Sequence, residues 1–310
     1  MPARMRNRAR CQQATRYHWL VGRSGIFTPR GRSIVSVSSD EVREYWESRS
    51  PGLKHSQEPI GTPAFFAAIE HERYADAFKY AYLKDIVGFE EHSGEKILEV
   101  GTGLGTDILQ FARAGSDVTG IDLTARAVEL TKKRFEQEGL VGHFQQASFT
   151  ELPFDDNCFD VVYSFGVLHH SKETDQGIAE IHRVLKPGGQ LIVMLYHKGF
   201  KYYVRKLFLY GVLRAEFLRL SPQEVVNRHS EDFGGSPLTK VYSRGQARKL
   251  FAAFEQLALD CYRLDDYIPF RGHRFSLARS ILPSRLYRAM ENTAGWNLII
   301  RGSKPELNQH

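Results

Sequence analysis

The chain has 310 residues, of which 42% are hydrophobic and 25% charged, enough for one large α/β domain with additions. Its net charge of +6 belongs to the first 39 residues, which hold eight arginines and no Asp, Glu or Lys; from Asp40 onward 34 basic residues stand against 36 acidic ones. A nearly neutral body gives no support to nucleic-acid binding, and no run of about 18 apolar residues could cross a membrane.

The three cysteines, Cys11, Cys158 and Cys261, lie far apart and lack the CxxC spacing and paired histidines of a zinc site. Neither a metal site nor a disulfide framework is indicated. We therefore expect a reducing, cytoplasmic location.

Residues 1–38 combine Arg, Ser and Gly without an acidic side chain, which predicts a disordered basic extension. A transit peptide has this composition. A start site assigned too far upstream would look similar, and a basic arm could contact an acidic surface, so three explanations stay open.

An N-terminal helical lid is predicted over residues 39–92. Ser39 or Asp40 is expected to cap a short helix over Glu41–Ser48. After a Pro/Gly stretch, aromatic and aliphatic residues at helical spacing predict an amphipathic helix over Pro63–Lys84.

Short apolar runs then alternate with helical stretches, the pattern of a parallel sheet covered by helices on both faces. The predicted strands are Lys96–Val100, Asp117–Ile121, His143–Ala147, Phe159–Ser164 and Gln190–Tyr196. The predicted helices are Thr106–Ala114, Thr124–Glu138 and Thr174–Val184. A helix over Arg244–Phe254 and strands near Leu257–Arg263 and Trp296–Arg301 would complete the sheet with an antiparallel edge.

A glycine loop follows the first of these strands, in the segment ILEVGTGLGTD that ends at Asp107. Its glycines permit positive φ and close approach of a ligand, and the next helix offers free N–H groups to a carboxylate. The loop reads GxGxG, with Thr106 where a dinucleotide fingerprint has its third glycine. Glu99, just before the loop, would repel a pyrophosphate and attract an ammonium group.

A second acidic residue, Asp122, ends the next strand in the segment GIDLT. Its carboxylate could accept both hydroxyls of a ribose. The alternative is a plain N-cap for the following helix, but the coincidence with the glycine loop favours ribose binding.

Residues 96–196 resemble the class I methyltransferases, specifically the methyltransferase type 11 group that contains ubiquinone and menaquinone methyltransferases. The matching segments are ILEVGTGLGTD, GIDLT, ELPFDDNCFDVVYSFGVLHH and EIHRVLKPGGQLIVMLY, in family order and spacing. The resemblance implies a doubly wound, Rossmann-like, seven-stranded α/β methyltransferase sheet that binds S-adenosyl-L-methionine. The implied contacts to the methionine part are Glu99, Gly101, Thr102, Gly103 and Asp107; Asp122 would hold the ribose, and Leu123 would cover the adenine.

Two positions depart from this family pattern or extend it. Ser148 and Phe149 stand where the family often has an Asp-Ala pair against the adenine edge. A serine hydroxyl can still accept a hydrogen bond there. Ser164 and Phe165, at the end of the fourth strand, would pass near the sulfonium.

Methyl transfer from a sulfonium depends mainly on alignment and exclusion of water, so a base is optional. For a hydroxyl acceptor the candidate bases are His169 and His170, with His169 preferred as the catalytic pocket residue. The alternative is that one of these histidines only packs beneath its loop.

The stretch Lys198–Leu220 places apolar residues at helical spacing among several basic ones. A cap over the acceptor pocket is the preferred interpretation, and a peripheral membrane contact or a dimer face are the alternatives. The predicted organisation is an extension (1–38), a lid (39–92), an S-adenosylmethionine-binding core (93–197), an insertion or cap (198–243) and a C-terminal completion of the sheet (244–304).

The predicted function is methyl transfer to an O, N or C atom of a small apolar molecule, with the oligomeric state left open. The Asn/Asp-Pro-Pro-aromatic motif of nucleobase amine methylation is absent, which disfavours a nucleic-acid substrate. A non-catalytic protein that kept the cofactor fold is the main alternative. An NAD(P)-dependent oxidoreductase is a further one that would need the GxGxxG loop.

Overall fold

The computed structural model describes residues 37–49, 52–53, 56–75, 80–231, 235–264, 268–270, 273–275, 279 and 281–306. Apart from residues 37 and 38, the predicted basic extension lies outside the described residues. Part of the predicted helix over Pro63–Lys84 lies outside them as well.

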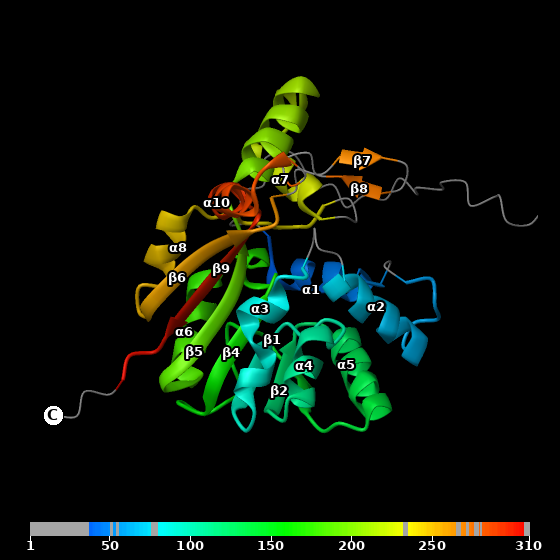
Figure 1. Cartoon of the computed structure of the whole chain (residues 1–310), viewed down its shortest axis with the longest axis vertical. Coiled ribbons are helices and arrows are strands. Elements are labelled where there is room, and N and C mark those ends of the chain that lie inside the picture. The colour runs from blue at the N-terminus through cyan, green and yellow to red at the C-terminus, as the bar shows by residue number, and fades with distance from the viewer. Residues whose placement is uncertain are drawn as a thin grey trace, which may run out of the picture. The chain divides into compact units, whose positions relative to one another are not determined.

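A seven-stranded sheet lies at the centre of the described chain, in the order β3-β2-β1-β4-β5-β9-β6 (Figure 1). The strands are β1 (Lys96–Val100), β2 (Asp117–Asp122), β3 (His143–Gln146), β4 (Phe159–Phe165), β5 (Leu185–Tyr196), β6 (Glu255–Tyr262) and β9 (Asn297–Ser303). Strands β1 to β5 pair in parallel, and β9 enters antiparallel between β5 and β6. The predicted seven-stranded α/β sheet with an antiparallel edge is thus confirmed, and its order reverses between β1 and β4, where such sheets bind ligands.

Helices cover both faces of this sheet and form two cores. On one face lie α3 (Leu83–Val87), α4 (Thr106–Arg113) and α5 (Ala125–Glu138); on the other lie α6 (Thr174–Val184) and α8 (Arg244–Leu250). Successive strand residues point to opposite faces, so Ile97 of β1 joins the core under α4 and Leu98 joins the core under α6.

The lid begins with α1 (Ser39–Ser48) and α2 (Pro63–Ala75), which lie near the carboxyl ends of the parallel strands (Figure 1). Ser38 caps α1, rather than the predicted Ser39 or Asp40. The reason is the capping box that Ser38 forms with Glu41, which satisfies two backbone N–H groups at once.

Both lid helices are tied to the core by carboxylates. Glu47 of α1 accepts hydrogen bonds from the first two backbone N–H groups of α5, each at 3.0 Å. Glu70 of α2 pairs with Arg113 and with the buried Arg134, both at 2.6 Å. These contacts fix the lid against α4 and α5.

A helical segment follows β5, as predicted. It consists of a π-helix, η5 (Lys201–Leu213), a 3-10 turn, η6 (Glu216–Leu218), and α7 (Pro222–Ser230). Among the described residues, no helix is both long enough and apolar enough to pass through a bilayer.

The sequence patterns do not predict two features near the C-terminus. These are the hairpin of β7 (Ile268–Phe270) and β8 (His273–Phe275), and helix α10 (Ser284–Ala294), which packs against β6. Three-residue strands are too short to show a period. Only Tyr287 of α10 is buried, so its apolar stripe is narrow. The remaining short turn, η3 (Phe89–His92), leads into β1.

Candidate active site

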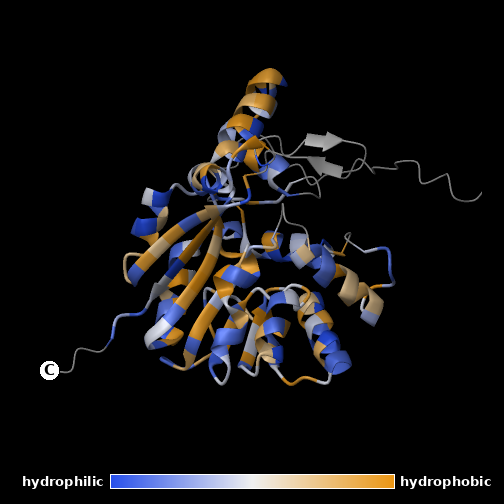
Figure 2. Ribbon diagram, viewed as in Figure 1, coloured by the Kyte–Doolittle hydropathy of each residue, from blue (hydrophilic) through white to orange (hydrophobic). Residues whose placement is uncertain are grey.

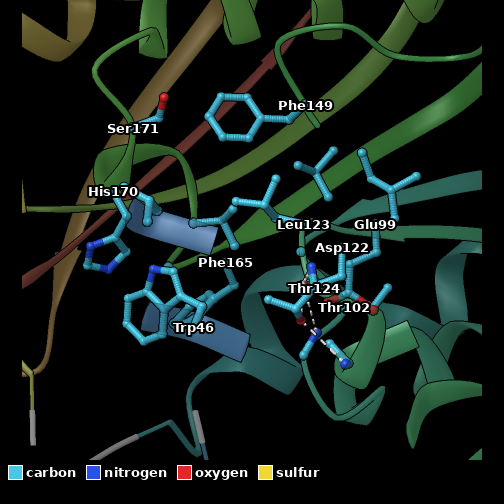
Figure 3. Close-up of a pocket in the computed structure, with 18 of the residues that line it drawn as sticks. Trp46, Glu99, Thr102, Asp122, Leu123, Thr124, Phe149, Phe165, His170 and Ser171 are labelled. Atoms are coloured by element: carbon cyan, nitrogen blue, oxygen red, sulfur yellow. Dashed lines mark hydrogen bonds between the residues drawn. The ribbon is translucent and has the colours of Figure 1, made fainter. Parts of the chain in front are cut away.

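A cavity of about 320 Å³ lies beyond the carboxyl ends of β1, β2, β4 and β5 (Figure 3). The glycine loop forms its floor, and residues of α1 and α2 form part of its wall. The sequence-predicted residues that line it are Glu99, Gly101, Thr102, Gly103, Asp107, Asp122, Leu123, Ser148 and Phe149. The topology therefore gathers at one place most of the residues that the motifs single out.

The glycine loop has the backbone that its sequence predicts. Gly101 has φ +84°, and a Cβ there would stand 2.2 Å from a methyl of Val167. Gly103, with φ +54°, would place a Cβ in open space. No side chain caps the first turn of α4. Its N–H groups are thus available for an anionic group at this helix start.

Glu99 presents an unpaired oxygen in this site. Its side chain is buried, and Oε2 has no hydrogen-bond partner among the described residues. Burial, together with the nearby Asp107 charge, raises the pKa of Glu99 well above its usual value. A buried carboxyl oxygen without a donor fits an incoming ammonium group.

Asp122 connects the second strand to the glycine loop. Its Oδ2 accepts the Gly103 backbone N–H at 3.0 Å, and Oδ1 accepts the N–H and hydroxyl of Thr124 at 2.9 and 2.8 Å (Figure 3). Thr124, rather than Asp122, caps α5. Asp122 thus faces the cavity and is held in place by hydrogen bonds that do not include the cap.

Replacing Asp122 with alanine is expected to weaken binding of S-adenosylhomocysteine by about 10–100-fold, because charge-assisted hydrogen bonds contribute about 1.5–3 kcal/mol. Titration calorimetry would measure the change. Thr150→Ala is a matched control, since Thr150 also lines the cavity but only bonds to Ser148. Equal affinities of Asp122→Ala and wild type would contradict ribose binding.

Asp107 lines the cavity, but its carboxylate is already occupied. It forms a two-pronged ion pair with Arg73 of α2, and it accepts the hydroxyls of Tyr74 at 2.6 Å and Tyr163 at 2.7 Å. Burial alone would raise the pKa of Asp107, but Arg73 and these donors hold it below its usual value. The expected direct contact of Asp107 with a methionine group gives way here to anchoring of the lid.

Arg73 is a site residue that the patterns do not single out, since a basic residue on an amphipathic helix usually marks a solvated face. Here its guanidinium lies over the rings of Tyr80 and Phe165, at 4.8 and 4.6 Å from their centres, and lines the cavity. The helical spacing could place Arg73 on α2 but could not show that Asp107 faces it.

Ser164 does not reach the cavity where Ser148 and Phe149 do. It is buried, and its hydroxyl donates to the Val100 carbonyl at 3.0 Å within the sheet. Side chains alternate along β4, so the neighbouring Phe165 faces the cavity instead. The expected contact of Ser164 with the sulfonium is therefore corrected to Phe165.

The two histidines after β4 exchange the roles expected of them. His169 is fully buried, stacks on the ring of Tyr196 at 4.0 Å, and has no hydrogen-bond partner for either ring nitrogen within the described chain. It does not line the cavity, whereas His170 does (Figure 3). The 3-10 turn η4 (Leu168–His170) rotates successive side chains by about 120°, which turns His169 into the core and His170 outward.

His170 has a defined tautomer. Its Nδ1 lies 2.8 Å from the Leu238 carbonyl, which can only accept, so the proton sits on Nδ1. The other nitrogen, Nε2, keeps its lone pair and lies 3.6 Å from a carboxylate oxygen of Glu231. Burial lowers the pKa of His170 despite the Glu231 charge. At neutral pH His170 is therefore an uncharged imidazole with a basic Nε2.

Aromatic side chains surround this imidazole. The Trp46 ring lies edge-on to it at 4.9 Å, and Tyr196 lies at 6.0 Å and donates its hydroxyl to Glu231 at 3.1 Å. Trp46, Tyr196 and Glu231 all line the cavity. Glu231, at the end of α7, carries no sequence signal for this position, because only the packing of α7 brings it to His170.

The stretch predicted as a cap lies elsewhere. None of residues 198–220, all of which the structure describes, lines the cavity. The insertion reaches the site only through Glu231. Residues of α1 and α2 take the covering position instead, because the contacts of Glu47 and Glu70 hold those helices there.

Comparisons with known proteins agree with this geometry. A family model described as a methyltransferase domain matches residues 98–193. The chain is 38% identical to a demethylmenaquinone methyltransferase of Clavibacter sepedonicus, over 33% of this chain and 41% of that protein. It is 30% identical to a ubiquinone/menaquinone biosynthesis C-methyltransferase of Shewanella halifaxensis, over 46% of this chain and 68% of that protein. The chain thus spans less than half of the first relative.

One similar solved structure is a magnesium protoporphyrin IX methyltransferase of Synechocystis with bound S-adenosylhomocysteine. It has a TM-score of 0.53 and 15% identity, and the match covers 86% of this chain and 100% of that one. At this identity the likeness concerns the fold.

Proposed function

Since this chain belongs to the class I S-adenosylmethionine-dependent methyltransferases, we propose that it methylates the hydroxyl oxygen of a small apolar molecule. The observation that carries the proposal is the neutral His170, set among aromatic rings in the same cavity as the glycine loop. A hydroxyl is a poor nucleophile until it loses its proton, and such a base removes it.

The residues present fit S-adenosylmethionine. The unpaired Oε2 of Glu99 suits its ammonium, and the uncapped start of α4 suits its carboxylate. Asp122 offers remaining lone pairs to ribose hydroxyls, and the apolar Leu123 and Phe149 suit an adenine. When bound, the cofactor supplies an electrophilic methyl on a positively charged sulfur.

His170 would accept the proton of the acceptor hydroxyl at Nε2. The oxygen then forms its bond to the methyl carbon as the carbon–sulfur bond breaks, and that electron pair stays on sulfur. Glu231, 3.6 Å from Nε2, stabilises the imidazolium that forms, and Tyr196 orients Glu231 by its hydrogen bond. Proton, methyl and charge are thereby accounted for.

The aromatic wall supports an apolar acceptor. Trp46, Tyr80 and Phe165 line the cavity next to His170 or Arg73, and they exclude water from the reacting atoms. Such a wall also aligns a flat acceptor by ring contacts.

A panel of matched apolar phenols and anilines tests the acceptor class. Purified protein and S-adenosylmethionine are incubated with each, and formation of S-adenosylhomocysteine is measured. Turnover is expected with phenols and not with anilines, which attack as neutral amines and need no base beforehand. Equal turnover of both series would remove the role of the base.

The cofactor assignment predicts release of a proton on binding. In the free protein the raised pKa of Glu99 keeps its proton up to a higher pH, and an ammonium partner favours the charged form. At about pH 6, above the usual carboxyl range, the calorimetric enthalpy of S-adenosylhomocysteine binding should therefore depend on the ionisation enthalpy of the buffer.

The Glu99→Gln variant is expected to lose most of that buffer dependence and about 10–100-fold in affinity. NADH serves as the control ligand and should not bind. An unchanged proton release in Glu99→Gln would move the ammonium site away from this residue.

A further inference from the structure

The segment after β5 exposes a set of large apolar side chains that the cavity does not use. We name as the η5–η6 face the following residues: Phe208, Leu209, Val212, Leu213, Phe217 and Leu218. Their exposed fractions run from 37% for Phe217 to 85% for Leu218. Monomeric surfaces rarely gather so many apolar side chains without a partner.

Local structure aligns these side chains. Backbone hydrogen bonds of a π-helix join residues five apart, and Tyr203, Phe208 and Leu213 recur at that interval with at least half of each side chain exposed. In Figure 2, orange bands run along this helix, which is the yellow-green one at the top of Figure 1. The helix extends beyond the carboxyl edge of the sheet.

The tip of the face is built rather than loose. Ala215 turns the chain with φ +55°, and the Phe217 ring then packs on Gly211, where a Cβ would stand 2.2 Å from it. α7 follows and packs along η5. The apolar side chains are therefore held in position before any partner arrives.

The charges around the face have one sign. From His197 to Ala215 the sequence holds no Asp or Glu, while Arg205, Arg214 and Arg219 lie among the apolar residues. The one acidic residue nearby, Glu216, is half-buried and bonded to His229 at 2.9 Å. The face therefore combines exposed apolar groups with uncompensated positive charge.

We propose that the η5–η6 face docks this protein on a membrane surface rich in anionic phospholipid. Apolar side chains enter the boundary between headgroups and acyl chains, while arginines contact phosphate groups. A second copy of the chain is the poorer partner, because a two-fold contact would bring the same positive charges together. Covering of the chain's own cavity is excluded by the distance of residues 198–220 from its lining.

Flotation with lipid vesicles tests this docking. Wild-type full-length protein is expected to float with vesicles containing about a quarter phosphatidylglycerol, and much less with pure phosphatidylcholine. The triple variant Phe208→Ser, Leu213→Ser, Leu218→Ser should lose at least about tenfold in vesicle affinity. This variant keeps every arginine of the first 38 residues, so its loss is specific to the face.

A matched control removes three exposed apolar side chains elsewhere, in Ile60→Ser, Val141→Ser, Ile281→Ser, whose exposed fractions are 48%, 83% and 68%. It should float like wild type. A charge variant, Arg205→Gln, Arg214→Gln, Arg219→Gln, should lose the preference for phosphatidylglycerol. Thermal unfolding confirms that each variant is folded.

Three outcomes would overturn the proposal. The first is wild type that stays unbound on both vesicle types, and the second is a serine variant that floats like wild type. The third is light scattering that shows a wild-type dimer and a monomeric serine variant, because the face would then be a contact between copies. None of these measurements depends on methyl transfer.

Discussion

Replacing His170 with asparagine is expected to lower kcat by about 10²–10⁴-fold, the usual contribution of a general base. Asparagine can still donate a hydrogen bond to the Leu238 carbonyl, as His170 does at 2.8 Å. It has no basic nitrogen to take the acceptor's proton. Affinity for S-adenosylhomocysteine should stay unchanged, since the imidazole lies at the acceptor end of the cavity.

The pH profile identifies this base more specifically than the loss of rate does. Protonated His170 cannot accept a proton, so kcat/KM of the wild type should fall as the pH drops through the His170 pKa. Because burial lowers that pKa, the acidic limb should lie below about pH 6.5, the ordinary histidine value. In His170→Asn this limb should vanish from the residual activity.

A variant of the neighbouring histidine provides the matched control. His169→Phe keeps a ring against Tyr196 and removes two nitrogens that have no partner in the described chain. Its kcat should stay close to that of wild type. If His169→Phe lost the activity and His170→Asn kept it, the assignment of the base would be reversed.

Replacing Asp107 with alanine is expected to destabilise the protein by about 3–5 kcal/mol, the usual cost of removing one partner of a buried ion pair. Arg73 would be left without its carboxylate, and the hydroxyls of Tyr74 and Tyr163 would lose their acceptor. Denaturant unfolding measures the free energy directly. The lid should also open, so cofactor affinity should fall together with stability.

Two comparisons separate anchoring from direct cofactor contact. Asp160→Ala removes a carboxylate that pairs at the surface with Lys186, and it should cost far less stability. The Asp107 contribution is present above the unfolded carboxyl pKa and is lost as the pH falls through the lower pKa of the folded state. Wild-type stability in Asp107→Ala would show that the ion pair does not hold the lid.

The sequence by itself determined the cofactor half of the site. Glu99, the glycine loop and Asp122 lie at the ends of two neighbouring strands, so their spacing along the chain already fixes their spacing in space. Local rules also located most sheet strands and the Thr124–Glu138 helix. Parallel pairing then brings the carboxyl ends of these strands together without further information.

Only the tertiary structure decided the acceptor half. The pairing of Arg73 with Asp107, and the approach of Glu231 to His170, join elements that no local pattern relates. A single turn of 3-10 helix decided that His170 and not His169 faces the cavity. Side-chain direction at such a turn depends on packing against distant segments, whereas strand and loop spacing depends on neighbours in the chain.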